Sequence, residues 1–237
     1  KNKKLIHSFP LKFIIDESYS TSEPIGKKCK KLGMTCLNLM VDDKIHNKLA
    51  ESFFKNKINI KNFFDSGVAS AYGCLTESEK QEGSICIDIG GSTTKTTAFL
   101  NGRIVYHRIT SIAGNDVTND ISQGLEIPEE SAELIKIIHG TINPTFNEKI
   151  DIDIESNKGK IINKNLLYGI IRPRYDEIFE IIRDNIFDDI YARVGIKSII
   201  LTGGGSKIFG IANLCSSIFN RKVRIGQIED SRSFFFN

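Results

Sequence analysis

Residues 85–99, "ICIDIGGSTTKTTAF", decide how the rest of the chain is interpreted. Apolar residues lead to a glycine pair and β-branched residues follow it, which predicts a strand, a polar turn and a second strand. Because glycine has no Cβ, successive N–H groups of such a turn can point into one concavity that suits a phosphate. Asp88 would place a carboxylate beside it, where a hydrated Mg²⁺ ion fits. An ordinary hairpin with a polar turn is the alternative.

The composition indicates a folded globular protein. The chain has 237 residues, of which 40% are hydrophobic, enough for one large domain or two small ones. Its 32 basic residues nearly balance 29 acidic ones, so we predict no nucleic-acid-binding surface. The one dense basic run, residues 27–31, is expected to be a solvated loop. Five cysteines without CxxC spacing favour neither a disulfide framework nor a zinc site, and no run is long enough to span a membrane.

The first part of the chain predicts two strands and then two helices. Residues 5–16 and 34–43 have strand patterns separated by a basic loop. Residues 44–58 predict a helix, and residues 63–83 predict a second helix closed by a charged linker that ends in glycine. The apolar face of the first helix would consist of Ile45, Leu49, Phe53 and Ile58.

A β-meander is predicted next, over residues 85–89, 94–100 and 103–110, with a type I′ turn at Asn101 and Gly102. A helix is expected to start near the sequence "GNDVTNDI" that follows.

The remaining elements are predicted from the spacing of apolar residues and from residues that favour helix ends. Residues 127–140 read as a helix that starts near Pro128, and residues 149–163 alternate like a hairpin. Residues 166–195 predict a long amphipathic helix that Pro173 kinks or divides.

A second glycine cluster lies in "IILTGGGSKIFGIANL", where Gly203, Gly204 and Gly205 separate a strand from a helix N-terminus. Free N–H groups there favour an anion or a polar ligand edge, although a tight structural turn explains the glycines equally well. Glu133 and Lys136 lie three apart on one predicted helix and share a face. The pair is suited to clasping ribose hydroxyls, or else forms a solvent-facing ion pair.

The order of these motifs resembles the second half of an actin-like ATPase, and in detail the FtsA family of bacterial cell-division proteins. The resemblance covers about residues 5 to 226 and implies an α/β, actin-like (ribonuclease H-like) fold with mixed sheets flanked by helices and a small 1C-type subdomain. The stretches that carry it are "DSGVASAYGCLTESEKQEGSICIDIGGSTT", "AGNDVTNDI", "AELIKIIHG", "IIRPRYDEIFEIIRDNI" and "LTGGGSKIFGIANLCSSIFNRKVRIG".

The resemblance also implies a division into subdomains, with ATP in the cleft between the two halves. Residues 1–40 would belong to a partial 1C-like subdomain and residues 41–83 to the remainder of 1A. Residues 84–113 and 196–237 would form the nucleotide-binding 2A, and residues 114–195 would form 2B.

By resemblance, the cofactors are ATP and Mg²⁺, the latter held by Asp88 through water. The family's second phosphate loop matches Asp88, Gly90, Gly91, Ser92, Thr93 and Thr94. Its nucleoside-clasping helix matches Glu133 and Lys136, and its adenosine loop matches Gly203, Gly204 and Gly205.

The family implies partners as well. FtsA holds the C-terminal tail of the tubulin-like protein FtsZ on subdomain 2B, and Arg174 and Glu177 are our candidates for that contact, with surface ion pairing as the alternative. Self-association into actin-like filaments, contact with other divisome proteins through the 1C-like part, and a place at the cytoplasmic face of the inner membrane at the division septum are also implied.

The chain departs from the family pattern in the opening stretch. Ser92 stands where the family has a third glycine, and Lys95 replaces an acid near the expected metal site, so we hypothesise that ATP hydrolysis is impaired. The family's first phosphate loop, of DIGxx type, has no match before residue 85, and its C-terminal amphipathic membrane helix has no match at "SRSFFFN". The sequence is therefore expected to be truncated at both ends, and to reach the membrane only if that helix is supplied.

Three functions compete at this point. The first is an FtsA-type adaptor that binds ATP and links FtsZ to the membrane, with at most weak ATPase activity. The second is a small-molecule kinase or an activator ATPase of the same superfamily. The third is a truncated remnant that no longer binds ATP.

Overall fold

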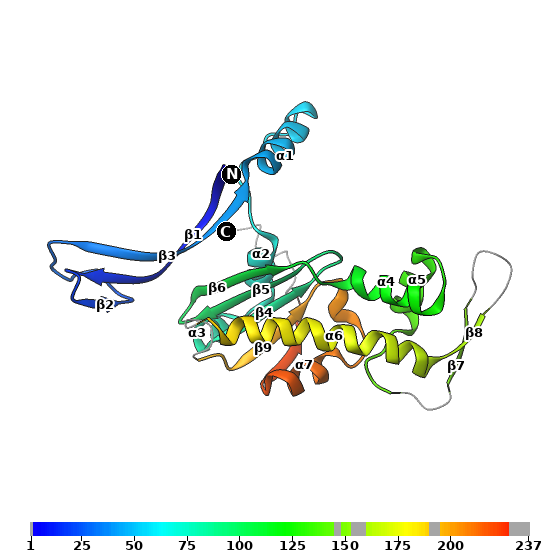
Figure 1. The fold of residues 1–237 in the computed structure, drawn as a ribbon. Helices are drawn as coiled ribbons and strands as arrows, with labels where there is room; N and C mark the ends of the chain where they lie inside the picture. Colours follow the sequence, from blue (N-terminus) through cyan, green and yellow to red (C-terminus); the bar gives the residue numbers. More distant parts are fainter. Residues whose placement is uncertain (1, 145–147, 153–159, 190–194, 228–237) are drawn as a thin grey trace.

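A computed structural model describes most of the chain (Figure 1). The described residues are 2–144, 148–152, 160–189 and 195–227.

A three-stranded antiparallel sheet opens the fold and extends away from the main body (Figure 1). Its strands are β1 (Lys3–Ile15), β2 (Tyr19–Thr21) and β3 (Leu32–Asp42), in the order β2-β1-β3. The two long strands were both predicted, and the basic loop at residues 27–31 is exposed as expected. Helix α1 (Asp43–Lys55) follows directly, with the Asp42 carboxylate accepting the Lys44 N–H at its start.

A mixed five-stranded sheet forms the centre of the molecule, in the order β10-β9-β4-β5-β6. The strands are β4 (Ser84–Ile89), β5 (Thr94–Leu100), β6 (Arg103–Thr110), β9 (Ser198–Thr202) and β10 (Lys222–Ile225). Strands β4, β5 and β6 form the predicted antiparallel meander, whereas β9 runs parallel to β4. The predicted turn between β5 and β6 is confirmed, because Asn101 and Gly102 have φ values of 51° and 72°.

Helices cover both faces of this sheet, and α6 runs along one of them (Figure 1). The remaining elements are α2 (Ser66–Cys74), α3 (Glu77–Glu82), α4 (Gly114–Leu125), α5 (Glu129–His139), β7 (Lys149–Ile152), β8 (Lys160–Asn163), α6 (Lys164–Phe187), the 3₁₀ turn η1 (Gly204–Lys207) and α7 (Ile211–Phe219). The mixed sheet flanked by helices confirms the predicted α/β class.

Alternation along β4 divides the interior into two cores. Ile85, Ile87 and Ile89 belong to the larger core, which they share with α4, α5, α6 and α7. Cys86 belongs to the smaller core, with α2 and with Phe9 of the hairpin packed against it. The period of two along a strand places these residues on opposite faces, so the central strand joins the two halves of the molecule.

The helix predicted at the start of residues 63–83 is confirmed as α2, but the charged linker predicted to close it is wrong, because that segment forms a second helix, α3. The first ends at Cys74, and Thr76 starts the second. The Thr76 hydroxyl accepts the Glu79 N–H, and the Glu79 carboxylate accepts the Thr76 N–H, which is a complete capping box. These bonds satisfy N–H groups that a continuous helix would have bonded internally.

Helix α1 is confirmed, but its predicted apolar face differs in two ways. Ile58 lies beyond the helix, which ends at Lys55 before Lys57 adopts a φ of 58°. Ile45 and Leu49 are 63% and 47% exposed, so the face is not buried against any described residue.

Pro173 does not divide the predicted long helix, since α6 is continuous. Buried residues lie on both sides of the proline, including Leu167, Ile171, Tyr175 and Ile178. Packing of this face outweighs the lost backbone hydrogen bond. Over the described residues, no helix is long and apolar enough to cross a membrane.

We predict that Phe99→Ala lowers the free energy of unfolding by about 3–5 kcal/mol, because Phe99 is fully buried between α2 and the sheet. Phe54→Ala is the matched control, because Phe54 is 81% exposed, and it should change stability by less than about 0.5 kcal/mol. Urea unfolding of both variants measures the difference. Equal losses would contradict the assignment of the smaller core.

Candidate nucleotide-binding site

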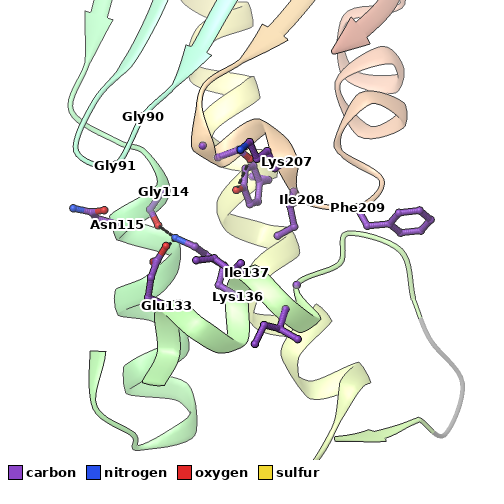
Figure 2. A pocket seen from close by; sticks show the side chains of 15 residues that line it. Gly90, Gly91, Gly114, Asn115, Glu133, Lys136, Ile137, Lys207, Ile208 and Phe209 are labelled. Carbon is purple, nitrogen blue, oxygen red and sulfur yellow. Dashed lines mark hydrogen bonds and ion pairs between the residues drawn. The ribbon is translucent and has the colours of Figure 1, made fainter. Parts of the chain in front are cut away.

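A pocket of about 530 Å³ lies where the β4–β5 turn, the start of α4, helix α5 and the β9–η1 turn meet (Figure 2). The residues that line it are Gly90, Gly91, Gly114, Asn115, Glu133, Lys136, Ile137, Ile138, Gly140, Tyr175, Gly204, Gly205, Lys207, Ile208 and Phe209. Three of its walls therefore contain the motifs that the sequence singled out.

The glycine turn is held against the start of α4 by its carbonyl groups. Gly114 N donates to Gly90 O at 2.9 Å, and Asn115 N donates to Gly91 O at 2.7 Å. With the carbonyls used in this way, the N–H groups of Gly91, Ser92 and Thr93 have no acceptor among the described residues. Successive unbonded N–H groups in a turn form a site for an anion.

A close backbone contact requires a glycine at position 203. A Cβ on Gly203, which has a φ of 85°, would lie 2.4 Å from Ile89 O. A Cβ on Gly91 would meet Asn115 Oδ1 at 2.9 Å, but that exposed side chain can move away. Gly204 differs, because a Cβ there would meet no atom within 4 Å. Gly204 therefore borders open space in the pocket.

Glu133 and Lys136 form a closed cluster with α4. Lys136 Nζ lies 2.6 Å from Glu133 Oε2, 2.7 Å from Thr118 Oγ1 and 2.9 Å from Gly114 O. These three contacts use all three ammonium hydrogens, so Lys136 positions Glu133 and α4 and has no hydrogen left for a ligand. The side chain of Glu133 is 43% exposed, and its contacts with Lys136 and Thr118 use only Oε2, which leaves Oε1 to accept hydrogen bonds from hydroxyl groups.

The charge of Glu133 follows from these contacts. Burial favours the neutral acid, but hydrogen bonds from Lys136 and Thr118 outweigh it and lower the pKa of Glu133. The carboxylate is therefore ionised at neutral pH and acts as an acceptor.

The far wall of the pocket is mostly apolar. Ile137, Ile138 and Phe209 are 68%, 67% and 70% exposed at its edge. Buried Tyr175 donates its hydroxyl to Gly205 O at 2.9 Å and so supports the glycine loop from below. A flat apolar ligand group fits such a wall.

The structure places the predicted contact residues in two groups. Those that line the pocket are Gly90, Gly91, Glu133, Lys136, Gly204 and Gly205. Ser92 and Thr93 lie in the same turn, and Thr94 is buried with its hydroxyl bonded to Ile112 O at 2.7 Å. Asp88 and Gly203 lie next to the pocket but outside its lining.

Asp88 faces α2, where its Oδ2 accepts the Ser70 hydroxyl at 2.8 Å. Lys95 is half-buried on the same side of the sheet, close to Gly67, and its Nζ donates to Thr93 Oγ1 at 3.2 Å. Lys95 thus supports the glycine turn from outside the pocket lining. Among the described residues, no group of three or more His, Cys, Asp or Glu side chains is placed to hold a metal ion.

The glycine triplet does not lead directly into a helix N-terminus as predicted. It opens the 3₁₀ turn η1, and α7 begins only at Ile211. The reason is local, since Ser206 donates both its N–H and its hydroxyl to Gly203 O and closes a tight turn.

Several lining residues were not predicted as contacts, among them Gly114, Asn115, Gly140, Tyr175, Lys207 and Ile208. Gly114 and Asn115 open the "GNDVTNDI" helix, and Lys207 and Ile208 directly follow the glycine triplet, so both pairs lie in stretches that were already notable. Tyr175 also lies in a quoted stretch, "IIRPRYDEIFEIIRDNI", but nothing in that stretch indicates a pocket contact, because α6 reaches the pocket only through packing.

Arg174 and Glu177 lie on α6, away from this pocket. Arg174 Nε and Nη2 bind Asp120 of α4 at 2.6 and 2.8 Å, and its Nη1 binds Glu177 at 2.6 Å. The hydrogen bonds that Arg174 donates to Asp120 raise the pKa of Arg174. The pair therefore links α6 to α4, and Glu177 stays exposed.

The sheet order, the helices on both faces and the pocket between glycine turns define a protein of the actin-like class. Among solved structures, the chain is similar to MreB5 of Spiroplasma citri bound to ADP, with a TM-score of 0.66, 22% identity, and coverage of 79% of this chain and 61% of that chain. It is also similar to the PilM–PilN type IV pilus biogenesis complex, with a TM-score of 0.70, 16% identity, and coverage of 94% and 56%. At these identities the likeness establishes the fold, and the predicted actin-like fold is confirmed.

The sequence comparison identifies the family. The family model "Cell division protein FtsA" matches residues 85–234, well over half of the chain. A curated relative, the cell division protein FtsA of Buchnera aphidicola subsp. Acyrthosiphon pisum, is 29% identical over 234 residues, covering 94% of this chain and 56% of the relative. The chain belongs to the FtsA family of cell-division proteins, and it spans about half the length of the curated relatives that it matches.

We predict that the cluster of Glu133, Lys136 and Thr118 makes the free energy of unfolding fall at acidic pH. Because the folded state lowers the pKa of Glu133 below the ordinary 4.5, its contribution is complete above that value and is lost as pH falls through the folded pKa. The effect should be below about 1 kcal/mol, since Glu133 is substantially exposed. Urea unfolding should be measured between about pH 6 and pH 3, a range that brackets ordinary carboxyl pKa values. The free energy of unfolding should fall less steeply with acid in Glu133→Gln than in the original protein.

Glu130→Gln is the control for this experiment, because Glu130 is exposed on the same helix and has no ion-pair partner among the described residues. It should retain the full acid dependence. Identical pH profiles for the original protein and Glu133→Gln would show that the cluster does not hold the charged form.

Proposed function

We propose that the chain is the nucleotide-binding part of an FtsA-type division protein and that the pocket binds ATP. The observation that carries the proposal is the turn at Gly91, Ser92 and Thr93, whose three N–H groups have no acceptor among the described residues. A phosphate group supplies the several acceptor oxygens that such a turn needs.

The other walls fit the rest of a nucleotide. Glu133, held in its ionised form by Lys136, would accept hydrogen bonds from the ribose hydroxyls. The base would lie against Gly204, Gly205 and the side chain of Ile208, where the lining is apolar and Gly204 leaves open space. A triphosphate would then extend toward the glycine turn.

A magnesium ion would accompany the triphosphate on the Asp88 side of the turn. The hydrogen bond from Ser70 uses Asp88 Oδ2, so Oδ1 is available to a metal-bound water. Mg²⁺ commonly keeps several waters and uses one or two carboxylates together with phosphate oxygens. The ion would neutralise phosphate charge, and the nearby cation Lys95, held by Thr93, supports our hypothesis that hydrolysis is slow.

We further propose the adaptor role of the FtsA family for the whole protein. In this proposal residues 1–40 and 41–83 contribute to 1C and 1A, residues 84–113 and 196–237 form 2A, and residues 114–195 form 2B. ATP would govern self-association into filaments, subdomain 2B would bind the FtsZ C-terminal tail, and the 1C-like part would contact other divisome proteins. The protein would act at the cytoplasmic face of the inner membrane at the division septum.

The FtsZ contact is supported by the surface around Arg174. Its three hydrogen bonds to Asp120 and Glu177 leave two of the five guanidinium hydrogens for a peptide carboxylate. Leu166, which is 51% exposed, lies two turns earlier on the same helix face. An exposed apolar residue two turns from an anchored cation suits a short peptide with both apolar and acidic side chains.

We predict that Gly204→Val weakens ATP binding on the order of tenfold or more, because the new side chain would occupy the open space of the pocket. The fold should be unaffected, since a Cβ at this position meets no atom within 4 Å. Gly169→Val is the matched control, because Gly169 is equally open but lies on α6 outside the pocket lining. Calorimetric titration with ATP measures both variants, and equal affinities would place ATP elsewhere.

We predict that Arg174→Ala weakens binding of a synthetic FtsZ C-terminal tail peptide by about tenfold, through loss of a charge-assisted hydrogen bond. Arg183→Ala is the control, because Arg183 is a similarly half-buried arginine of α6 whose one ion pair within the described residues is with the adjacent Asp184. Fluorescence anisotropy of a labelled peptide reports both affinities. If Arg183→Ala weakened the complex as much as Arg174→Ala, the peptide would be held by general charge and not by this site.

A further inference from the structure

Lys95 carries a positive charge close to the glycine turn, and no carboxylate of a described residue forms an ion pair with it. The residue is half-buried near the start of β5, and its side chain runs back toward the turn, where Nζ donates to Thr93 Oγ1 at 3.2 Å. Gly67 of α2 makes room for the stem, because a Cβ at that position would lie 2.6 Å from Lys95 Cβ and 3.0 Å from Lys95 Cδ. A lysine ammonium group has three hydrogens, so the contact with Thr93 leaves two for a ligand.

The neighbours of Lys95 on the α2 side explain why its charge stays unpaired. His107 lies beside it, since a Cβ on Gly67 would meet both side chains. Burial and the charge of Lys95 lower the pKa of His107 in spite of Asp65, so the imidazole is uncharged at neutral pH. Asp65 has partners of its own, because its Oδ1 accepts the Val68 N–H at 2.9 Å and lies 3.3 Å from His107 Nε2.

Asp88 lies directly opposite Lys95 in the pairing of β4 with β5. Residues that face each other in this way point to the same side of the sheet, with Cβ atoms about 5 Å apart. The two side chains have separate partners, since Asp88 Oδ2 accepts the Ser70 hydroxyl at 2.8 Å and Lys95 Nζ donates to Thr93. Their opposite charges offset each other at the turn, so a phosphate there meets little net negative charge and an ammonium group with hydrogens to donate.

We propose that Lys95 donates hydrogen bonds to a phosphate group of bound ATP and supplies positive charge there, so that ATP binding by this chain depends little on Mg²⁺. The inference rests on the proposed ATP binding. Thr93 connects the two, because its N–H is one of the three that would bind the phosphate and its hydroxyl holds the ammonium group. Lysine suits this role as a compact charge on a flexible stem, which can turn from Thr93 to the phosphate. A magnesium ion on the Asp88 side would meet the like charge of Lys95, and so would add less affinity than at a site without this lysine.

The test measures ATP affinity with Mg²⁺ and with excess EDTA, by calorimetric titration of the original protein and of Lys95→Met. Methionine keeps the length and the apolar stem of the side chain but removes the charge. In the original protein we expect the two affinities to differ by less than about threefold. In Lys95→Met the affinity in EDTA should fall on the order of tenfold, through loss of a charge-assisted hydrogen bond, and Mg²⁺ should restore most of it.

Two controls separate this role from damage to the fold. Lys222→Met removes an exposed lysine of β10 that pairs with Ser198, and it should leave both affinities unchanged. This position is at the far end of the sheet, because Ser198 also pairs with Ser84, the first residue of β4, whereas the glycine turn follows the last residue, Ile89. Adenosine has no phosphate, so Lys95→Met should bind it as the original protein does.

Two results in the ATP titrations would overturn the proposal. One is ATP binding by the original protein that requires Mg²⁺, and the other is equal Mg²⁺ dependence in the original protein and in Lys95→Met. A loss of adenosine affinity as large as the loss of ATP affinity would show that the variant disturbs the whole pocket, and would also count against a phosphate contact. Absence of ATP binding by the original protein in both conditions would instead contradict the proposed function.

Discussion

The candidate site depends on the contact between the glycine turn and the first residues of α4. Two backbone hydrogen bonds, from Gly114 to Gly90 and from Asn115 to Gly91, use the carbonyl groups of the turn. The N–H groups on the other side of the turn have no acceptor in the part of the chain that the structure describes. Lys136 fixes the same junction from α5 by donating to Gly114 O, so one small cluster determines both the position of the glycine turn and that of Glu133.

The surrounding fold keeps this junction rigid. Ile85, Ile87 and Ile89 bury the strand before the turn in the larger core, where α4, α5 and α6 pack together. Tyr175 of α6 reaches the second glycine loop, so both glycine loops are supported by one core. On the opposite face of the sheet, Asp88 accepts a hydrogen bond from Ser70 of α2 and thereby connects the strand before the glycine turn to α2. A ligand that moved Asp88 would act on that contact.

Much of the fold could be predicted from local sequence signals. The meander of β4, β5 and β6 and its turn at Asn101 and Gly102 follow from alternation and from the need for positive φ. Helix α3 was predicted as a linker, although Thr76 and Glu79 form a capping box that is visible in the sequence. The continuity of α6 through Pro173 could not be predicted, because it depends on burial of the helix by residues far away in the sequence.

The site was predictable only where local sequence patterns mark it. The glycine turns and the spacing of Glu133 and Lys136 are visible in the sequence, and the structure brings them around one pocket. Tyr175 joins that pocket only through the path of α6. Whether Lys136 would contact a ligand or a neighbour could not be read from its spacing, and in the structure its three hydrogens bind protein acceptors.

The most direct test of the account is the backbone amide NMR spectrum of the glycine turn during a titration with ATP. The account predicts saturable shifts of the Gly91, Ser92 and Thr93 amide resonances, because these N–H groups would change from water to phosphate as their acceptor. If ATP bound while these three resonances stayed unchanged, the turn would not be the phosphate site, and the central claim would be contradicted.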